Sequence, residues 1–437
     1  MSIPTLQGLQ TALSGLIANQ EAIDTTGHNI TNANTPGYSR QTAVMQTNTP
    51  LPIAAMSQLT GAGGQMGTGV TVTTFERVRN VYLDQQYRTQ NAALGSATAE
   101  ANELKQAQSA FDEPSSSGIS SQMSAFWSAW SSLANDPSSE AAREGVVSTG
   151  KQLATTLNQL NGQLETISAQ ATQQYTAITG ATGEVQDDAN QIAQLNHQIQ
   201  ISEAAGQNPN DLLDRRDELL DKLSELGNTT VTKAPDGTDT VTFGDAAKPL
   251  VEGTTVNWPQ ELTAAAGGQL GALLKVSSPT GPLAAYREAL NEVADDLTSS
   301  VNALHTSTPF FTGTTAATIK VAVTPAEVQS AGNATSGGNE VAQAIANLRG
   351  GTADQRYAGL IAQVGSDVQT AEDDQSTSQA VVSAIGSQRE SVSGVSLDEE
   401  MTNLISFQRG YEASARTLTA MDQMLETLID HTGSAGM

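Results

Sequence analysis

The two ends of the chain carry apolar residues at alternating intervals of three and four, the spacing that gives a helix one apolar face. Near the N-terminus this face comprises Leu6, Leu9, Leu13, Leu16, Ile23 and Ile30. Near the C-terminus it comprises Leu404, Phe407, Tyr411, Ser414, Leu418, Met421, Leu425 and Leu428. Gln20 and Gly27 interrupt the first series. We therefore expect the terminal helices to pair as an antiparallel coiled coil in which the N-terminal seam is the weaker.

A dense group of turn-forming residues ends the first helix. It consists of Asn29, Asn32, Asn34, Pro36, Gly37 and Tyr38. Asparagine and Pro-Gly in this density predict an ordered turn over residues 29–41. We expect Pro36 and Gly37 to set the exit angle of the chain and Tyr38 to anchor the turn by packing. An ordinary loop is the alternative.

Between the ends, the same helical periodicity recurs in four long segments. They are residues 83–111, 153–199, 283–304 and 361–392. Gly180 and Gly183 lie inside the second segment, where they predict a bend. The start of the last helix is predicted by the capping-box pattern Ser396 to Glu399. Helices of this length and number predict a mainly α fold with an elongated helical-bundle body.

Strand patterns are confined to short segments. A hairpin is predicted from residues 229–232 and 240–243, joined by Pro-Asp-Gly at 235–237, and residues 248–251 and 255–258 are candidate additions to it. A second extended patch is expected over residues 318–323. The glycine-rich run 61–69 reads as a loop that leads into a short strand at 70–73.

Charge narrows the classes of partner. Asp and Glu outnumber Lys and Arg by 46 to 20, which gives a formal net charge of −26. This balance argues against nucleic acid and against an anionic membrane surface as partners. The chain has no cysteine, which excludes disulfides and cysteine metal sites and suits an oxidising exterior. Neither a cleavable secretory signal nor a membrane-spanning apolar run is visible, so we expect no membrane insertion.

Catalytic patterns are not found. The four histidines, at positions 28, 197, 305 and 431, lack metal-ligand spacing, and phosphate-loop and nucleophile-elbow motifs are missing. The charged run from Asp214 to Glu225 reads as the solvated polar face of a helix. We therefore expect no cofactor and no enzymatic activity.

Several segments resemble the axial proteins of the bacterial flagellum, that is, its rod, hook and hook-associated proteins. The N-terminal match covers residues 8–20 and 27–41, and the sequence Asn-Thr-Pro-Gly-Tyr-Ser-Arg-Gln at 34–41 is most similar to the family of hook-associated protein 1. The C-terminal match covers residues 393–415. Two internal segments, 212–226 (Leu-Leu-Asp-Arg-Arg-Asp-Glu-Leu-Leu-Asp-Lys-Leu-Ser-Glu-Leu) and 267–274, resemble internal signatures of the same family.

The resemblance implies a structural subunit of the hook–filament junction with a flagellin-like architecture. Such proteins form a ring of copies of themselves, contact the hook protein and the second junction protein, and use their terminal helices for assembly. The resemblance also implies type III export without a cleaved signal, guided by a chaperone on the C-terminal helix, and an extracellular location on the flagellum. It implies that Leu404, Phe407, Tyr411, Leu418, Met421, Leu425 and Leu428 serve both assembly and chaperone binding.

The same resemblance suggests how the chain divides. Residues 1–45 and 395–437 would form the terminal assembly domain, 46–227 and 265–394 the helical body, and 228–264 a small β region attached to it. Longer members carry a large β-domain after the segment that ends at His305. Here only residues 306–335 precede the next helix, so we expect that outer domain to be absent or reduced to a stub.

Three rival functions stay open at this point. A rod or hook protein, or the second junction protein, would share the two ends but not the block at 212–226. A secreted helical effector or adhesin would use similar helices against a host surface. An enzyme is the third, and no motif supports it.

Overall fold

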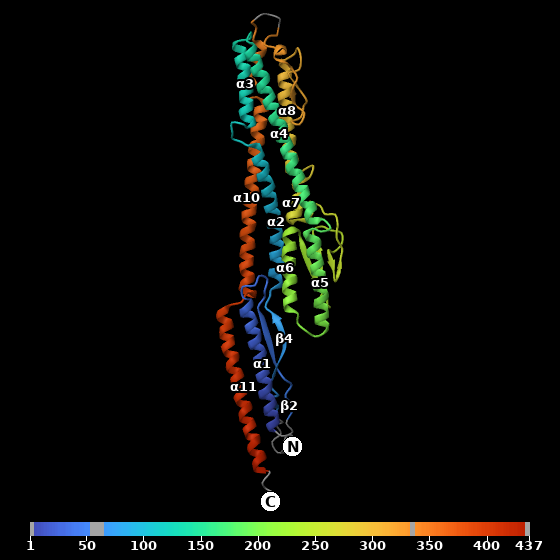
Figure 1. Cartoon of the computed structure of the whole chain (residues 1–437), viewed down its shortest axis with the longest axis vertical. Coiled ribbons are helices and arrows are strands. Elements are labelled where there is room, and N and C mark those ends of the chain that lie inside the picture. The colour runs from blue at the N-terminus through green and yellow to red at the C-terminus, as the bar shows by residue number, and fades with distance from the viewer. Residues whose placement is uncertain (1–3, 53–64, 333–336, 433–437) are drawn as a thin grey trace.

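The computed structural model describes residues 4–52, 65–332 and 337–432, and the molecule is a long rod of helices (Figure 1). Its helices are α1 (Pro4–Asn32), α2 (Val81–Phe111), α3 (Ile119–Asn135), α4 (Glu140–Thr179), α5 (Glu184–Ala204), α6 (Asn210–Leu226), α7 (Gly268–Ser277), α8 (Pro282–Leu304), α9 (Glu340–Ala346), α10 (Thr352–Ser393) and α11 (Leu397–Thr432). Two short 3₁₀ turns, η1 (Ala264–Ala266) and η2 (Pro325–Glu327), complete the helical elements. The prediction of a mainly α, elongated bundle is confirmed.

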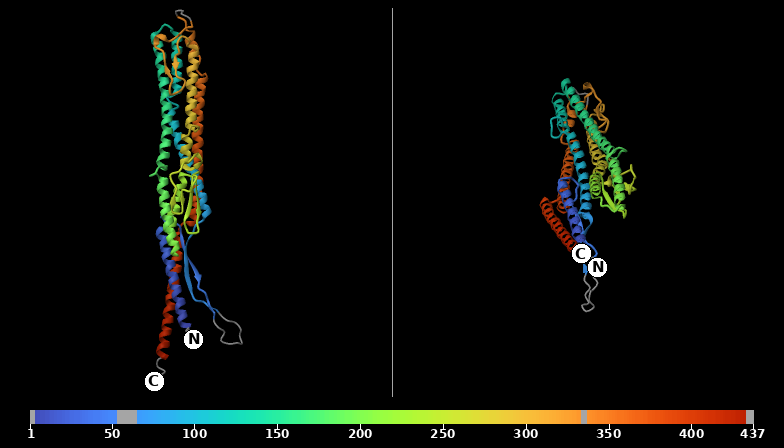
Figure 2. Two further views of the ribbon diagram at one scale, coloured as in Figure 1. Left: turned by 90° about the vertical axis from the view of Figure 1, so that its right-hand side faces the viewer. Right: turned by 60° about the horizontal axis from the view of Figure 1, so that its bottom comes forward.

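The terminal helices α1 and α11 lie side by side at one end of the rod, with both chain termini at that end (Figures 1 and 2). They run antiparallel. An antiparallel ribbon of β1 (Gln41–Thr47) and β4 (Val70–Arg77) packs against α1 and carries a second small pairing of β2 (Leu51–Pro52) with β3 (Gln65–Met66). We call α1, α11 and this ribbon the arm, and the remainder of the molecule the body.

The body has two cores. The larger one fills the bundle of α3, α4, α8, α9 and the upper parts of α2 and α10, where Phe126, Trp127 and Trp130 pack with Phe310 and Phe311. The smaller one lies between α5, α6 and the sheet β5-β6-β7-β8. That sheet consists of β5 (Thr229–Lys233), β6 (Asp239–Phe243), β7 (Val251–Glu252) and β8 (Thr255–Val256), all antiparallel neighbours. The predicted hairpin is therefore present, and each predicted addition is present only as a two-residue strand, of which β7 shares Val251 alone with the predicted 248–251.

The segment that follows α8 folds back onto the larger core. It pairs β9 (Phe311–Thr312) with β10 (Lys320–Val321), and Phe310, Phe311 and Ile319 are buried. Lys320 and Val321 fall within the extended patch predicted at 318–323. Asn302 holds the turn, because its amide donates to the carbonyl of Phe311 (2.8 Å) and its side-chain oxygen accepts from the Phe311 amide (3.0 Å).

Two local predictions were wrong. The helical periodicity over 153–199 predicted one bent helix, but the chain leaves the helix at Gly180 and starts a new one at Glu184. A Cβ at Gly183 would collide with the backbone carbonyls of Ala177 and Ile178, so only glycine fits at this break between the two helices. Strand β1 was not predicted at all, because its side chains are half-buried or exposed and show no clear alternation.

The predicted boundaries of strand β4 and helix α1 differ from the observed ones by only a few residues. Strand β4 starts at Val70 as predicted but continues to Arg77, and residues 61–64 of the glycine-rich run lie outside the described residues. Helix α1 continues to Asn32, so Asn29 and Asn32 belong to its last turns and the irregular segment is 33–40. The side chains of these asparagines, and not a break at Asn29, carry the turn, as described below.

Asp188 is a buried carboxylate with an unsatisfied oxygen. It lies on α5 in the smaller core, 6% exposed, and its Oδ2 has no hydrogen-bond partner. Burial, together with the charge of Glu184, raises the pKa of Asp188 to about 6, although Lys222 opposes the shift. Because the folded chain binds this proton more tightly than the unfolded chain does, stability contributed by the protonated form is present at low pH. It is lost as the pH rises from about 4 to above 6.

We predict that Asp188→Asn stabilises the protein by about 1–2 kcal/mol at pH 8, since the amide removes the cost of a buried charge. The gain should vanish near pH 4, where Asp188 of the folded wild type is already protonated. Urea denaturation at both pH values measures the difference. The exposed Asp295→Asn variant is the control and should change the free energy of unfolding by less than about 0.5 kcal/mol at either pH. Equal effects of Asp188→Asn at pH 4 and pH 8 would contradict the explanation.

Candidate functional site: the joint between arm and body

Within the described residues, one irregular segment joins α1 to the ribbon and another joins the body to α11. Residues 33–40 follow α1, and residues 394–396 separate α10 from α11. The two segments are tied to each other, because the amide of Arg40 donates to the carbonyl of Ser393 (2.9 Å). The geometry at this joint therefore fixes how the arm is held against the body.

Asn29 is the central residue on the arm side. It is 1% exposed and makes four hydrogen bonds. Its amide donates to the carbonyl of Gln41 (2.8 Å) and to Oε2 of Glu400 (3.0 Å). Its side-chain oxygen accepts from the hydroxyl of Tyr38 (2.7 Å) and from the Gln41 amide (2.9 Å). One asparagine thus joins α1, the turn, β1 and α11.

Arg40 and Glu400 complete this cluster. Glu400 is 2% exposed and accepts a hydrogen bond from Nε of Arg40 (2.8 Å), while a second nitrogen of Arg40 reaches Glu399 (3.0 Å). Because Glu399 is held by Arg40, it does not close the predicted capping box. The amide of Glu399 does donate weakly to the Ser396 hydroxyl (3.5 Å), which supports Ser396 as the start of α11.

Tyr38 is a neutral hydrogen-bond donor at this joint. Burial, and next the negative charges of Asp211, Asp214 and Glu400, raise the pKa of its phenol far above the ordinary value. The ring also lies against His28, with 5.5 Å between the ring centroids. The predicted anchoring of the turn by Tyr38 therefore has a physical basis in a buried hydroxyl as well as in packing.

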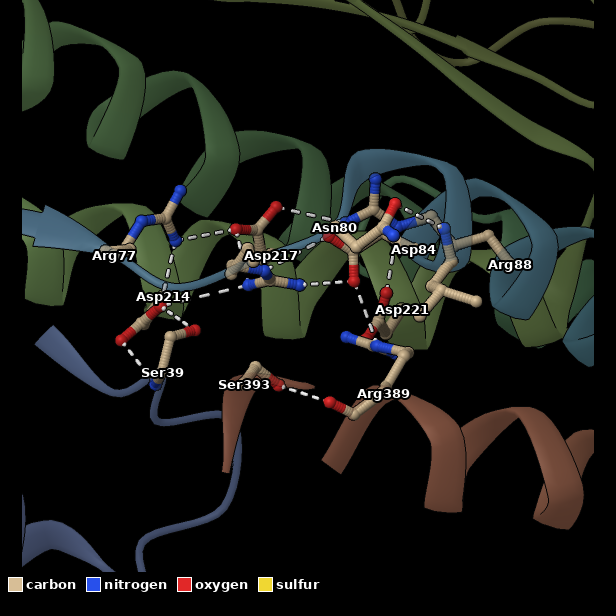
Figure 3. A network of polar contacts seen from close by, with 12 residues as sticks. Ser39, Arg77, Asn80, Asp84, Arg88, Asp214, Asp217, Asp221, Arg389 and Ser393 are labelled. Atoms are coloured by element: carbon tan, nitrogen blue, oxygen red, sulfur yellow. Dashed lines mark hydrogen bonds and ion pairs between the residues drawn. The ribbon is translucent and has the colours of Figure 1, made fainter. Parts of the chain in front are cut away.

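Ser39 links the turn to the body. Its amide donates to Oδ2 of Asp214 (2.9 Å) and its hydroxyl donates to Oδ1 (2.7 Å). Asp214 is on α6 and is 5% exposed. From this residue a chain of ion pairs runs along α6, as Figure 3 shows.

The ion network consists of carboxylates on α6 and guanidinium groups from β4, the β4–α2 connection, α2 and α10. Arg77 contacts Asp214 and Asp217 (both 2.8 Å), Arg79 contacts Asp217 (2.7 Å) and Asp84 (2.8 Å), Arg88 contacts Asp217 (3.0 Å) and Asp221 (2.8 Å), and Arg389 contacts Asp84 and Asp221 (both 2.9 Å). Arg389 also lies over the ring of Tyr87, 4.4 Å from its centroid. Two other stretches of the chain, residues 77–88 and the end of α10, therefore meet at this face of α6.

Asp217 has the most cationic surroundings. Burial alone would raise its pKa, but the charges of Arg79, Arg77 and Arg88 outweigh burial and hold the pKa at about 2. The prediction that residues 214–225 form a solvated polar face was wrong for this side of α6. Asp214, Asp217 and Asp221 are spaced at three and four residues, so they share one face, and that face is turned inward.

The network borders a cleft of about 890 Å³ between the two connecting segments and the body. Its lining mixes both charges, including Arg40, Lys222, Glu218 and Glu399. Within residues 4–52, 65–332 and 337–432, no group of histidine and acidic side chains has the arrangement of a metal site. Every charged group of the network described above has an oppositely charged partner, so the arrangement positions chain segments and offers no activated acid, base or nucleophile.

The predicted junction residues separate into two groups. Asn29 is buried, and Asn32 and Tyr38 are half-buried. Asn34, Pro36 and Gly37 are exposed at the tip of the turn, where Gly37 has a φ of 76° that favours glycine. Sequence reasoning did not single out Ser39, Arg40, Arg77, Arg79, Arg88, Asp214, Asp217, Arg389 or Glu400 as site residues. The available signal was the group of arginines around the start of α2, Arg77, Arg79 and Arg88.

The pairing of α1 with α11 has one fixed register. The facing pairs are Gly8 with Met421, Gly15 with Ser414, Asn19 with Gly410 and Asn29 with Glu400, and the two numbers of each pair add to the same total. By the same spacing Ala12, Ala22 and Thr26 belong to this line, and all three are buried. The contact line of α1 is therefore made of small residues that let α11 approach closely.

The predicted apolar stripe of α1 lies one residue further along, which rotates it by about 100° away from the contact line. Leu9, Leu16, Ile23 and Ile30 are half-buried, and Leu13 is exposed. Gly15, which the sequence suggested as a weakness, is instead a point of close approach, since a Cβ there would lie 3.0 Å from the Ser414 hydroxyl.

On α11, the predicted face lies toward α1 but is not fully covered. Leu404, Phe407, Tyr411, Leu418, Met421 and Leu425 are all half-buried. The side chains of Leu6 and Leu428 lie outside what the structure describes. In the described part of α11, Glu400 is the one residue that is fully buried.

Comparison with known proteins assigns these parts to a family. Residues 104–262 match the flagellar hook-associated protein FlgK helical domain, residues 9–38 the flagella basal body rod protein family, and residues 387–430 the flagellar basal body rod FlgEFG protein C-terminal family. A relative from Bacillus subtilis (strain 168), flagellar hook-associated protein 1, is 29% identical over 99% of this chain and 99% of its own length. Over its whole length the chain is therefore similar to flagellar hook-associated protein 1, and residues 104–262 match the FlgK helical domain.

Other relatives match over a shorter extent. Flagellar hook-associated protein 1 of Salmonella typhimurium is 31% identical over 63% of this chain, and that of Escherichia coli (strain K12) is 29% identical over 64%. The matched part spans just under half the length of these two relatives, 46% and 47%. A solved structure, that of the flagellar hook junction protein FlgK from Burkholderia pseudomallei, is 24% identical over 51% of this chain and 43% of that chain, with a TM-score of 0.44.

We predict that Asp217→Asn destabilises the protein by about 2–4 kcal/mol at pH 7, because three buried guanidinium groups would lose a shared charge partner. The folded-state pKa of Asp217 is depressed, so its contribution is complete above about pH 4 and is lost as the pH falls toward 2. The difference between wild type and variant should therefore shrink over that range in denaturant titrations. Glu218→Gln is the control, since its pair with Lys222 is exposed and should contribute less than about 0.5 kcal/mol. A pH-independent difference would contradict this explanation.

Asn29→Ala should loosen the joint without unfolding the body. The substitution removes the hydrogen-bond partner of the Tyr38 hydroxyl and of Oε2 of Glu400, whose Oε1 stays paired with Arg40, at a cost of about 2–4 kcal/mol. Hydrogen exchange should accelerate in the last turns of α1 and the first turns of α11, and stay unchanged in α3, α4 and α8. Asn34→Ala, at an exposed position of the same turn, is the control. Unchanged exchange in α11 would show that Asn29 does not couple the two helices.

Proposed function

We propose that this chain is a structural subunit that forms the junction between hook and filament of the bacterial flagellum. The observation that carries the proposal is the order of the family matches along the structure. Both rod-type matches fall on the arm and its joint, and the hook-associated match falls on the body from α2 to the end of the small sheet. A rod or hook protein would share the arm but not this body.

Different parts of the chain have different proposed roles. We propose that residues 1–45 and 395–437 form the assembly domain, that 46–227 and 265–394 form the helical body, and that 228–264 form a small attached β region. Residues 306–335 would stand where longer members of the family carry an outer domain. In support, their described part is a short cover on the bundle, with β9 and β10 of two residues each.

Assembly through the arm has a physical basis in exposed apolar side chains. Apart from Ile201 and Val381, the exposed large apolar residues of the described chain lie on the arm or at the ends of α2 and α10 nearest to it. They are Leu13, Ile17, Met45, Leu51, Val81, Tyr82, Val392, Leu397, Met401, Ile405 and Met424. Covering the rest of one such half-exposed side chain contributes about 1 kcal/mol. Several such side chains in each contact, repeated around a ring of copies, would offset the entropy cost of ordering the arm.

The proposed partners follow from this role. They are copies of the chain itself, the hook protein, the second junction protein and an export chaperone on the C-terminal helix. The half-buried face of α11 would serve both chaperone and assembly, so that the two exclude each other. Export by the flagellar type III apparatus would bring the chain to the cell exterior. No helix in the described residues is long and apolar enough to cross a membrane.

The proposal is tested by replacing the gene in its host. Cells that lack the chain should retain hooks, shed filaments and fail to swim, and a labelled chain should localise to hook tips. Diffuse secretion with normal filaments would favour a secreted effector or adhesin and overturn the proposal.

In the same strain, Tyr38→Ala should reduce swimming, because it removes both the ring against His28 and the hydroxyl bonded to Asn29. Tyr38→Phe keeps the ring and should have a smaller effect. The midpoint of thermal unfolding of the purified chain should hardly change for either variant, since Tyr38 lies outside both cores of the body. Normal swimming of Tyr38→Ala cells would show that the joint does not depend on this residue.

A further inference from the structure

The arm carries two exposed apolar stripes that a single copy cannot bring together. The first, which we call the lower stripe, is Leu13 and Ile17 on α1, which are 44% and 46% exposed. The second, the upper stripe, is Leu397, Met401 and Ile405 on α11, which are 48–50% exposed. Each stripe has a spacing of four residues, so its members lie in one row along their helix. Neither stripe is on the contact line between α1 and α11.

The fixed register keeps these stripes apart within one molecule. The facing pairs place Ile17 level with Glu412 and Asn29 level with Glu400. Met401 therefore lies about 16 Å further along the arm than Ile17, at 1.5 Å per residue. The joint excludes sliding, because Asn29, Arg40 and Glu400 lock the start of α11 to the end of α1.

Charge indicates what can cover the upper stripe. The exposed Asp398 flanks it at the first turn of α11, beside Glu399 and Glu400, which are paired with Arg40, in a chain with a formal net charge of −26. A second copy would be repelled by most of this molecule's surface. Residues 1–20, however, contain no Asp, Glu, Lys or Arg. The lower stripe therefore lies on an uncharged half-helix that can approach an acidic helix end without like-charge repulsion.

We propose that the lower stripe of one copy packs against the upper stripe of a neighbouring copy that is displaced along the arm axis. The inference rests on the proposed function and specifies the partner: a second copy of this chain, staggered by about 16–20 Å relative to the first. In the antiparallel contact, Ile17 of one copy meets Met401 of the next, and Leu13 meets Ile405. The half-exposed faces become buried in this contact. Because the two stripes differ, each copy uses its lower stripe toward one neighbour and its upper stripe toward another, so the contact repeats in one direction.

The contact can be tested by disulfide formation, because the natural chain has no cysteine. Two variants, Ile17→Cys with a size tag and Met401→Cys without one, replace the natural chain together in one strain. Isolated flagella are oxidised and analysed on non-reducing gels. Since each copy carries a single thiol, no bridge can form within one copy, and any bridge joins two separate chains.

The expected result is a tagged–untagged dimer as the main bridged product. Two controls calibrate it. Ile201→Cys, equally exposed but on the body, replaces Ile17→Cys and should give only background. Gly15→Cys with Ser414→Cys in one chain should close within a copy, because a Cβ at Gly15 lies 3.9 Å from the Ser414 Cβ, within the range of disulfides.

Three results would overturn the inference while leaving the proposed function intact, provided that the chain is present in the flagella. They are a bridge no stronger than the Ile201→Cys background, bridges only between identical variants, and bridging of Met401→Cys to a different protein. If the chain is absent from flagella, even without cysteine substitutions, the proposed function itself fails and the staggered contact fails with it.

Discussion

The joint depends on one set of charges, the carboxylates of Asp214, Asp217 and Asp221 on one face of α6. They gather guanidinium groups from two other stretches of the chain: residues 77–88, from the end of β4 into α2, and the end of α10. Apolar residues would also hold these elements, but without a preferred direction. A guanidinium–carboxylate pair has a fixed fork geometry, so the network defines an angle as well as a contact.

The ion network is connected to the arm through few atoms. Ser39 reaches Asp214 with two hydrogen bonds, and Arg40 reaches both Ser393 and Glu400. Because these residues follow one another in the turn after α1, the ion network is linked by hydrogen bonds and ion pairs to both α1 and α11. The body keeps its two apolar cores on the other side of the network. The body can therefore be stable on its own. The helices of the arm bury almost no large side chain, so the stability of the arm depends on contacts with neighbouring copies.

The helical part of the fold could be predicted from the sequence because its signal is local. Periodic apolar residues predicted α2, α8, α10 and the terminal helices, and Pro-Asp-Gly predicted the hairpin of β5 and β6. The break at Gly183 could not be predicted, since the same apolar spacing continues on both sides of it. The structure also placed β1 against β4, a pairing that joins segments far apart in the chain and has little local signal.

The candidate site was predicted only in part for the same reason. Asn29 and Tyr38 stand in a recognisable group of turn residues, so sequence reasoning found them. Asp214 and Asp217 alternate with Arg215 and Arg216, a pattern that is usually solvated. Their burial follows from arginines more than a hundred residues away, as the spans of these contacts show. Long-range charge pairing of this kind leaves no periodicity to detect.

The net charge of this chain favours separation of its copies, whereas assembly requires contact between them. The chain meets both requirements by placing its charges unevenly. A net charge of −26 keeps separate copies apart in solution, yet a subunit of a polymer must contact its neighbours. The chain carries its charges from Glu21 onward and leaves residues 1–20 without any. Where arginines are needed at the joint, each is neutralised by a buried carboxylate. The lower stripe, which is proposed to approach another copy, lies on this uncharged segment. Charge repulsion therefore opposes random aggregation more than it opposes the proposed ordered contact.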